Sequence, residues 1–86
     1  MRCKMVIAWD RSRSLTVRQI INALLKDGFY LRRQKGSHQR YQHPDGRRIT
    51  VTFHHFSDTF PPKTLKSMIQ EQARWTEEDL QRLGLF

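Results

Sequence analysis

The stretch from residue 29 to residue 53 restricts the fold of this chain more than any other, because two turn signals divide it into three short segments of strand-like sequence. The first signal is Lys35–Ser37, which contains a glycine. The second is Pro44–Gly46, in which Pro, Asp and Gly each favour a turn for a different steric reason. Strands joined by connections this short usually pair with their sequence neighbours. The stretch therefore predicts a three-stranded antiparallel meander.

Alternation along the segments predicts which side of this sheet is buried. In the first segment, residues 29–34, Phe29 and Leu31 alternate with a tyrosine and an arginine, the period of two that marks a half-buried strand. The second segment, residues 39–43, runs back antiparallel. In the third, residues 47–53, every second residue is apolar and arginine or threonine stands between. The sheet should thus have one apolar face and one polar face.

A helix is expected before the meander. Thr16–Gln19 matches the capping box, in which two side chains satisfy free N–H groups at a helix start. From Val17 to Leu24 the apolar residues recur at helical spacing. Gly28 stands where a glycine in the left-handed conformation ends a helix.

Two more helix starts follow the meander. One is expected near Lys63, with Leu65, Met68 and Ile69 on its apolar side, and a last short helix begins after Thr76, whose side chain suits an N-cap. The predicted fold class is α+β: a double-stranded-RNA-binding-like two-layer sandwich of α-β-β-β-α order. Both long helices should cover the apolar face of the three-stranded antiparallel sheet.

Eighty-six residues make one small domain, which we place at residues 14–86. Residues 1–13 form a separate N-terminal segment. Its apolar run Met5–Trp9 is compatible with an extra strand, an oligomer contact or a frayed arm. This run is too short for the core of a signal peptide, and no run in the chain reaches membrane-spanning length. With Cys3 as the one cysteine, a reducing compartment fits best, and a cytoplasmic protein without membrane contact is expected.

The charge of the chain favours a polyanionic partner. Sixteen Lys and Arg against eight Asp and Glu give a net charge of +8, which nucleic acid, an acidic protein or an anionic membrane would each satisfy. Residues 29–55 hold all four histidines, six cations and a single acid, Asp45, so we interpret them as a binding face rather than a merely solvated one. The six cations are Arg32, Arg33, Lys35, Arg40, Arg47 and Arg48. Tyr30 and Tyr41 are expected to be ordinary strand residues, although tyrosines here are also able to stack on bases.

Histidines among cations suggest metal-independent cleavage of RNA. One group must take the 2′-hydroxyl proton and another must protonate the 5′-oxygen that leaves, and imidazole suits both tasks. Fixed cations stabilise the charge on phosphorus. DNA lacks the 2′-hydroxyl and would resist. The chain has no carboxylate cluster of the kind that holds Mg²⁺, and no metal or cofactor is expected.

The four histidines differ in what their positions predict. His38 lies in the first turn, where a histidine taken alone is more often an ordinary polar residue than a catalytic one. His43 is expected to be a surface residue beside the second turn. His54 is a candidate second proton-transfer group, provided that the third strand ends near the first turn. His54 and His55 on a strand would point to opposite faces, so they are not expected to share a zinc ion.

Four stretches of the chain, in their order and spacing, resemble the HicA family, the small mRNA-degrading toxins of HicA/HicB toxin–antitoxin systems. They are Leu25–Phe29 (LKDGF), Arg33–His38 (RQKGSH), His43–Val51 (HPDGRRITV) and Thr64–Ile69 (TLKSMI). The resemblance implies a double-stranded-RNA-binding-like fold and ribonuclease activity on mRNA. It implies that His38 is catalytic and that a HicB-like antitoxin masks it.

In the function that this resemblance implies, each basic residue has a task. Arg33, Lys35 and Arg40 would hold or neutralise phosphate. Arg32, Arg47 and Arg48 would extend the basic surface, and no DNA contact of the chain's own is expected. Ser37 either hydrogen-bonds a phosphate oxygen or caps the turn.

The chain departs from the family pattern in three places. Thr52 replaces a proline that commonly precedes the histidine position filled here by His54. The exit of the second long helix, Gln72–Trp75, lacks the usual glycine, and the N-terminal segment is longer than the family needs.

Two other function classes fit the same composition. A non-catalytic RNA-binding module would use the same fold and the same basic face. A protein-interaction domain for an acidic partner would also be basic, but it would leave RNA intact.

Overall fold

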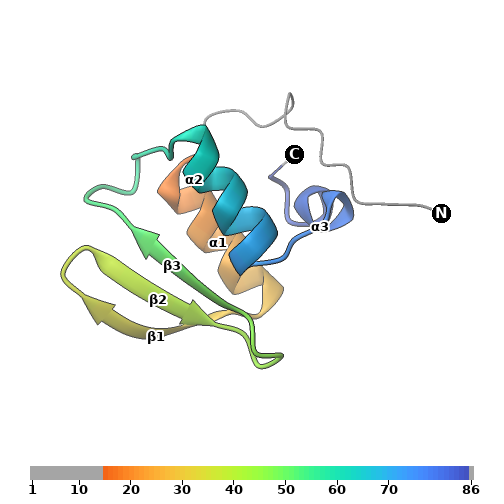
Figure 1. Cartoon of the computed structure of the whole chain (residues 1–86), viewed down its shortest axis with the longest axis horizontal. Coiled ribbons are helices and arrows are strands. Elements are labelled where there is room, and N and C mark those ends of the chain that lie inside the picture. The colour runs from red at the N-terminus through yellow and green to blue at the C-terminus, as the bar shows by residue number, and fades with distance from the viewer. Residues whose placement is uncertain (1–14, 86) are drawn as a thin grey trace.

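The computed structural model describes residues 15–85, so the expectations for residues 1–13 lie outside the part of the chain described below. Its elements follow the predicted order (Figure 1). They are α1 (Val17–Asp27), β1 (Tyr30–Lys35), β2 (His38–Gln42), β3 (Arg48–Thr52), α2 (Pro62–Ser67), which continues as the π-helical turn η2 (Met68–Gln72), and α3 (Glu77–Arg82).

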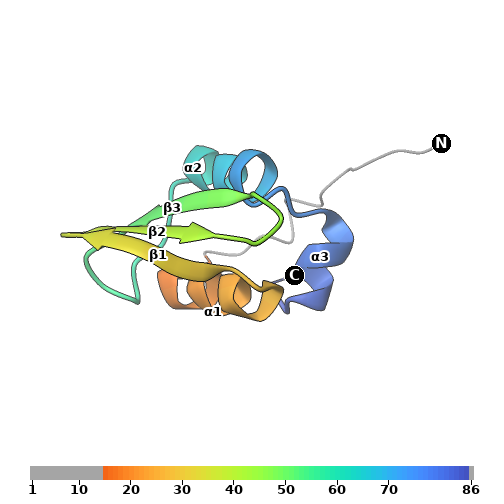
Figure 2. The same cartoon turned by 90° about the horizontal axis from the view of Figure 1, so that it is seen from below.

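The three strands form one antiparallel sheet of order β1-β2-β3, which confirms the predicted α+β fold. The strands gather on one side of the molecule and α1 and α2 on the other (Figure 1). Both views place the β1–β2 turn and α3 at opposite ends of the molecule (Figure 2). The core fills the space between helices and sheet. It includes Ile20, Leu24, Ile49, Val51 and Ile69, all almost fully buried.

Local signals set the ends of α1 as predicted. The Thr16 hydroxyl accepts a hydrogen bond from the Gln19 N–H at 3.2 Å, and the Gln19 side-chain oxygen accepts one from the Thr16 N–H at 2.8 Å. Gly28 ends the helix in the left-handed region, with φ of 105°. A Cβ at this position would lie 3.0 Å from His43 Nε2, so both the backbone angle and the close approach of a neighbouring loop require glycine.

The edge strand β1 is more exposed than its alternation predicts. Phe29 is buried, but every residue of β1 is exposed, and Leu31 is 44% exposed. Leu31 pairs with the buried Tyr41, so it does lie on the core side of the sheet, as expected. A β-bulge follows it at Arg32. The prediction of a half-buried strand therefore gives the correct side for Leu31 but too much burial, because the buried residues of the sheet are concentrated on β2 and β3.

The second long helix is not the continuous α-helix that the sequence predicts. After Ser67 it widens into η2, where the Ala73 N–H donates to the Met68 carbonyl at 2.8 Å, five residues back. The wider turn brings Gln72 to the free edge of β3, where its side-chain oxygen accepts the Thr50 N–H at 3.0 Å. A backbone N–H at the edge of a sheet needs a hydrogen-bond acceptor, and the π-helical turn supplies one through Gln72.

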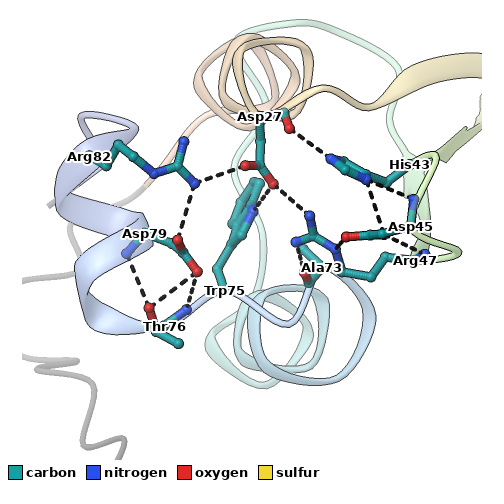
Figure 3. A network of polar contacts seen from close by, with 9 residues as sticks. All are labelled: Asp27, His43, Asp45, Arg47, Ala73, Trp75, Thr76, Asp79 and Arg82. Carbon is teal, nitrogen blue, oxygen red and sulfur yellow. Dashed lines mark hydrogen bonds and ion pairs between the residues drawn. The ribbon is translucent and has the colours of Figure 1, made fainter.

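One carboxylate joins the parts of the fold that local signals leave separate. Asp27, at the end of α1, has a side chain only 8% exposed. It accepts hydrogen bonds from the Trp75 indole at 2.9 Å and from the Arg82 guanidinium at 2.8 Å, and Arg47 Nη2 lies 3.2 Å from it (Figure 3). Burial alone would raise the pKa of Asp27, but these hydrogen bonds and cations outweigh it and hold the pKa below its usual value.

The exit of η2 carries a strained backbone angle that leads to a first prediction. Arg74 has φ of 57°, the only positive φ outside glycine in residues 15–85. A non-glycine residue pays about 1 kcal/mol or more in this region, although glycine loses more entropy on folding. Arg74→Gly should therefore raise the free energy of unfolding by about 0.5 kcal/mol in urea titrations. Arg74→Ala, which removes the charge but keeps the Cβ, should give no such gain. Equal stabilisation by both variants would contradict the strain argument.

The Asp27 carboxylate leads to a second prediction. Asp27→Asn keeps the shape but leaves Arg47 facing an uncharged group, and should lower the free energy of unfolding by about 3 kcal/mol at pH 7. Because the folded pKa of Asp27 is lowered, its contribution is complete above the unfolded pKa of about 3.9 and is lost as the pH falls through the folded value.

The stability gap between wild type and Asp27→Asn should therefore shrink below about pH 4 in the same titrations. Asp45→Asn is the matched control. Its carboxylate also bonds Arg47 but is 47% exposed, so it should have a much smaller effect. An Asp27→Asn effect no larger than that of the control would refute the central role of Asp27.

Candidate functional site

The candidate site begins at a tight hairpin turn. Gly36 and Ser37 alone connect β1 to β2. Gly36 has φ of 58°, whereas Ser37 has a negative φ, since Arg74 is the only non-glycine residue of the described chain with a positive one. This combination is that of a type II′ turn, whose first central residue is glycine. A Cβ on Gly36 would meet nothing within 4 Å, so the backbone angle rather than space requires the glycine. The turn places His38 at the first position of β2, where it is exposed.

The pairing register brings the basic residues together on one face. Arg33 lies opposite Arg40 and then Thr50, while Lys35 lies opposite His38 and then Thr52. Cross-strand partners project to the same side of a sheet. The intervening row contains the buried Tyr41 and Ile49, so it faces the core and the basic rows face away from it. We call this polar side the outer face. Its residues are Tyr30, Arg33, Lys35, His38, Arg40, Gln42, Arg48, Thr50 and Thr52.

Around the turn the outer face is hollowed. The hollow has a volume of about 570 Å³ and contains the predicted catalytic histidine with three of the predicted phosphate-binding cations. Its lining residues are Arg33, Lys35, Gly36, Ser37, His38 and Arg40. No acid lines it. Within residues 15–85, none of these three cations forms an ion pair. Arg33 lies directly opposite Arg40, a repulsive arrangement that no ion pair within the described residues offsets and that a bound anion would relieve.

Arg32 and Arg48 extend this basic surface as predicted. Arg48 belongs to the row of Gln42, at the far end of β2 from the turn. Arg32 occupies the bulge, and its Nη1 donates to the side-chain oxygen of Gln42 at 2.9 Å. A bulge re-aims a side chain. Here it directs Arg32 toward the outer face beside Arg33.

Arg47, in contrast, does not lie on the outer face, where the sequence analysis placed it. Its side chain is 17% exposed and its Nη1 donates to the Ala73 carbonyl at 2.7 Å. The guanidinium also pairs with Asp27 and Asp45 and lies over the Phe29 ring, 5.0 Å from the centroid. Its charge is therefore used inside the fold.

His43 also belongs to the interior and is not the surface residue that its position predicts. Its ring packs edge-on against Phe29 with centroids 5.1 Å apart. Nε2 lies 2.9 Å from the Asp27 carbonyl, and Nδ1 lies 3.1 Å from the Asp45 N–H. Nδ1 also lies 3.0 Å from Asp45 Oδ1, so both ring nitrogens have polar partners inside the fold. His43 fastens the β2–β3 turn to α1.

The loop after β3 returns to the turn of the candidate site. The Phe53 N–H donates to the Ser37 carbonyl at 3.0 Å. The Asp58 carboxylate then accepts the N–H groups of His54 at 3.2 Å and His55 at 3.0 Å. The hydrogen bond from the His55 N–H, and to a smaller extent that from the His54 N–H, holds the pKa of Asp58 below its usual value. The third strand thus ends near the first turn, which is the condition for His54 as a second proton-transfer group. His54 is exposed at the same end of the sheet as His38.

The two tyrosines have different environments. Tyr41 is buried, and its hydroxyl donates to the Gln39 side-chain oxygen at 2.8 Å. Burial raises the pKa of this phenol. Tyr30 is 47% exposed in the row of Gln42 and Arg48, so it is the tyrosine that a base is able to reach.

Two searches of the described residues bear on other kinds of site. Nowhere in residues 15–85 do three His, Cys, Asp or Glu side chains gather as metal ligands would. Among the helices of the same part of the chain, none has the length and apolar character needed to cross a bilayer.

Comparison with models of known protein families identifies the family of this chain. A family model described as the HicA toxin of bacterial toxin–antitoxin systems matches residues 17–75, which is more than half of the chain. The matched region runs from the start of α1 to Trp75 and includes the whole sheet and the His38 turn. A search of curated proteins finds no match.

The sequence grouped the residues of the hollow in one segment but did not show how the basic residues of that segment divide between the two sides of the sheet. Arg47 and Arg48 are neighbours of equal charge, yet Arg47 pairs with Asp27 whereas Arg48 lies on the outer face and forms no ion pair within residues 15–85. Alternation carried a usable signal, because Arg48 stands two residues before Thr50 on the polar side. The same alternation puts Arg47 in phase with Ile49 on the apolar side, but nothing local identifies its acidic partner, which is twenty residues away in α1.

Repulsion on the outer face leads to a third prediction. Arg40→Gln removes the like charge opposite Arg33 and should raise the free energy of unfolding by about 0.5 kcal/mol at low salt. The gain should vanish near 1 M salt, where the Debye length is about 3 Å. Lys26→Gln on the exposed side of α1 is the charge-matched control and should not stabilise. A loss of stability in Arg40→Gln at low salt would show that the pair is not repulsive.

Proposed function

Because this chain belongs to the family of HicA toxins of bacterial toxin–antitoxin systems, we propose that it acts as the toxin by cleaving mRNA at the hairpin that carries His38. The observation that carries the proposal is the composition of the hollow around the turn. An exposed imidazole shares it with Arg33, Lys35 and Arg40, and no acid lines it. Such a surface favours a phosphate group beside the histidine.

The proposed chemistry needs no metal ion. The 2′-oxygen loses its proton and attacks phosphorus, and the bond to the 5′-oxygen breaks as that oxygen gains a proton. His38 performs one of these proton transfers, since imidazole takes and gives protons near neutral pH. Lys35, directly opposite His38, and the Arg33–Arg40 pair stabilise the negative charge that builds on the phosphoryl oxygens.

The second proton transfer needs another group, and His54 is our candidate. The hydrogen bond between Phe53 and Ser37 ties the start of its loop to the turn, and Asp58 holds its backbone. Within residues 15–85 the Ser37 hydroxyl has no hydrogen-bond partner, so it is available to a phosphate oxygen.

An antitoxin partner follows from the family, and we propose that a HicB-like protein covers the hollow of His38. The outer face is open, and its unpaired cations would attract an acidic surface as readily as RNA. Covering the hollow would block phosphate and histidine together.

A non-catalytic RNA-binding module is the second candidate function. The same basic outer face favours it, because binding alone needs the cations and not the imidazole. Only the chemistry of His38 separates the two candidates.

The fourth prediction concerns this histidine. His38→Ala should lower cleavage of a fluorescent RNA, measured with EDTA present, by about 100-fold or more. Binding of RNA and thermal stability should stay close to those of the wild type, because His38 is exposed. Growth inhibition in a bacterial host should be lost as well. His55→Ala, an exposed histidine beyond the end of the same strand, is the matched control and should keep activity.

Several outcomes would contradict the proposal. Undiminished cleavage by His38→Ala would remove the residue from the mechanism. RNA binding without any cleavage by the wild type would favour the binding module. His54→Ala tests the second proton-transfer group separately, since a rate near that of the wild type would exclude His54 and leave the role of His38 intact.

A further inference from the structure

Beside the hollow of His38, the outer face continues into a second one. It has a volume of about 400 Å³. Its lining residues are Arg32, Arg33, Arg40, Tyr41, Gln42, Arg48, Ile49 and Thr50. Arg33 and Arg40 line both hollows, so the two form one continuous basic track across the sheet. No histidine and no acid lines the second hollow.

We infer that this second hollow is a binding subsite for single-stranded RNA, which holds the nucleotides next to the cleaved bond through their phosphates and one stacked base. The inference rests on the proposed function for the location of the cleaved bond. It adds the strandedness of the substrate, the direction in which it crosses the sheet, and the residues that position it without taking part in proton transfer.

The length of the track requires more than one nucleotide. His38 and Gln42 mark the two ends of β2, four residues apart. At about 3.4 Å per residue this is roughly 14 Å. Stacked nucleotides advance about 3.4 Å each along a strand. A strand that occupies both hollows therefore extends several nucleotides beyond the bond at His38.

The cations of the second hollow are set up to bind phosphate. The hydrogen bond from Arg32 to Gln42 fixes one guanidinium nitrogen and leaves the other donors of the fork free. Arg48 lies directly opposite Gln42, next to it on the outer face. Within residues 15–85 neither arginine forms an ion pair, although Arg47 beside them forms two. The fold thus neutralises the arginine that faces inward and leaves the outward ones for a ligand.

Tyr30 supplies a stacking surface at the end of the track. It pairs with Gln42 on the outer face and is 47% exposed. An exposed tyrosine on an edge strand gains little from folding, but its ring offers a face to an unstacked base.

The same features argue against a duplex as the ligand. Proteins of double-stranded-RNA-binding type span about 16 base pairs, and contact two minor grooves and the phosphates between them. Here the unpaired cations and the exposed tyrosine lie together on the open side of a sheet, which is how sheets present stacking and phosphate contacts to single strands. On the helix side, Arg18 lies over the Phe56 ring, 5.3 Å from its centroid.

The experiment measures binding separately from cleavage. A fluorescein-labelled 12-nucleotide strand of 2′-O-methyl RNA lacks the reacting hydroxyl, so it stays intact whatever His38 does. Its anisotropy is followed with the full chain, as a single strand and as a duplex with its complement, over a range of salt concentrations. Wild type should bind the single strand more tightly than the duplex.

The variants test each part of the subsite. Arg48→Ala should weaken single-strand binding by about 5-fold and reduce the slope of log affinity against log salt by about 0.7. Tyr30→Ala should weaken it by about 5-fold or more with little change in slope, and Tyr30→Phe should restore binding. Lys26→Ala, which removes one exposed cation from α1, is the control and should stay within 2-fold. Thermal midpoints verify that each variant is folded.

Three results would overturn the inference. Equal weakening by Lys26→Ala and Arg48→Ala would mean that net charge alone binds RNA. Tighter binding of the duplex, unaffected by Arg48→Ala, would place RNA on another face. Unchanged binding in both Arg48→Ala and Tyr30→Ala would leave the hollow without a ligand. If wild type fails to cleave RNA but shows the expected binding pattern, the proposed function fails while the subsite stands.

Discussion

The buried carboxylate of Asp27 is the interaction on which the rest of this structure depends. It lies at the end of α1 and receives Arg47 from the β2–β3 turn, Trp75 from the segment after η2, and Arg82 from α3. Four parts of a small domain are thus fixed to one point. A chain this small buries only a small core, so its free energy of unfolding is small and depends on such contacts. The cluster also holds the β2–β3 turn against the end of α1. It therefore helps to set how the sheet lies against the helices and which face of the sheet stays open.

The stretches that resemble HicA toxins belong to two groups, those that hold the fold together and one that lies on the outer face. Two of the stretches that carry the resemblance, Leu25–Phe29 and His43–Val51, supply Asp27, Gly28 and the partners His43 and Arg47, which hold the fold together. The stretch Arg33–His38 has no such task, because its charged side chains and its histidine lie on the outer face. Gly28 and Gly36 show the difference: the first is packed against His43, whereas the second has open space around it. The stretches that carry the resemblance therefore include both residues that stabilise the fold and residues that line the hollow of the candidate site.

The outer face carries positive charge that no ion pair in the described part of the chain compensates. Arg33 lies opposite Arg40, and Lys35 lies opposite His38, although acids elsewhere in the chain are drawn into ion pairs. Such a face costs stability in the isolated protein and gains it when an anion binds. RNA and an acidic partner would both meet this need, which links the two ligands that a toxin of this family is expected to have.

Sequence by itself determined the elements, because their signals are local. The two capping boxes, the left-handed Gly28 and the glycine of the first turn each act within a few residues, and alternation on β3 separated Arg48 from Ile49 correctly. Only the tertiary structure decided what lies beside what. It turned Arg47 and His43 inward, left Leu31 exposed, widened the second helix at Met68 and brought the loop of His54 back to the His38 turn. Each of these outcomes depends on partners many residues away, and the energy of a buried ion pair or a packed ring appears only once the chain has folded.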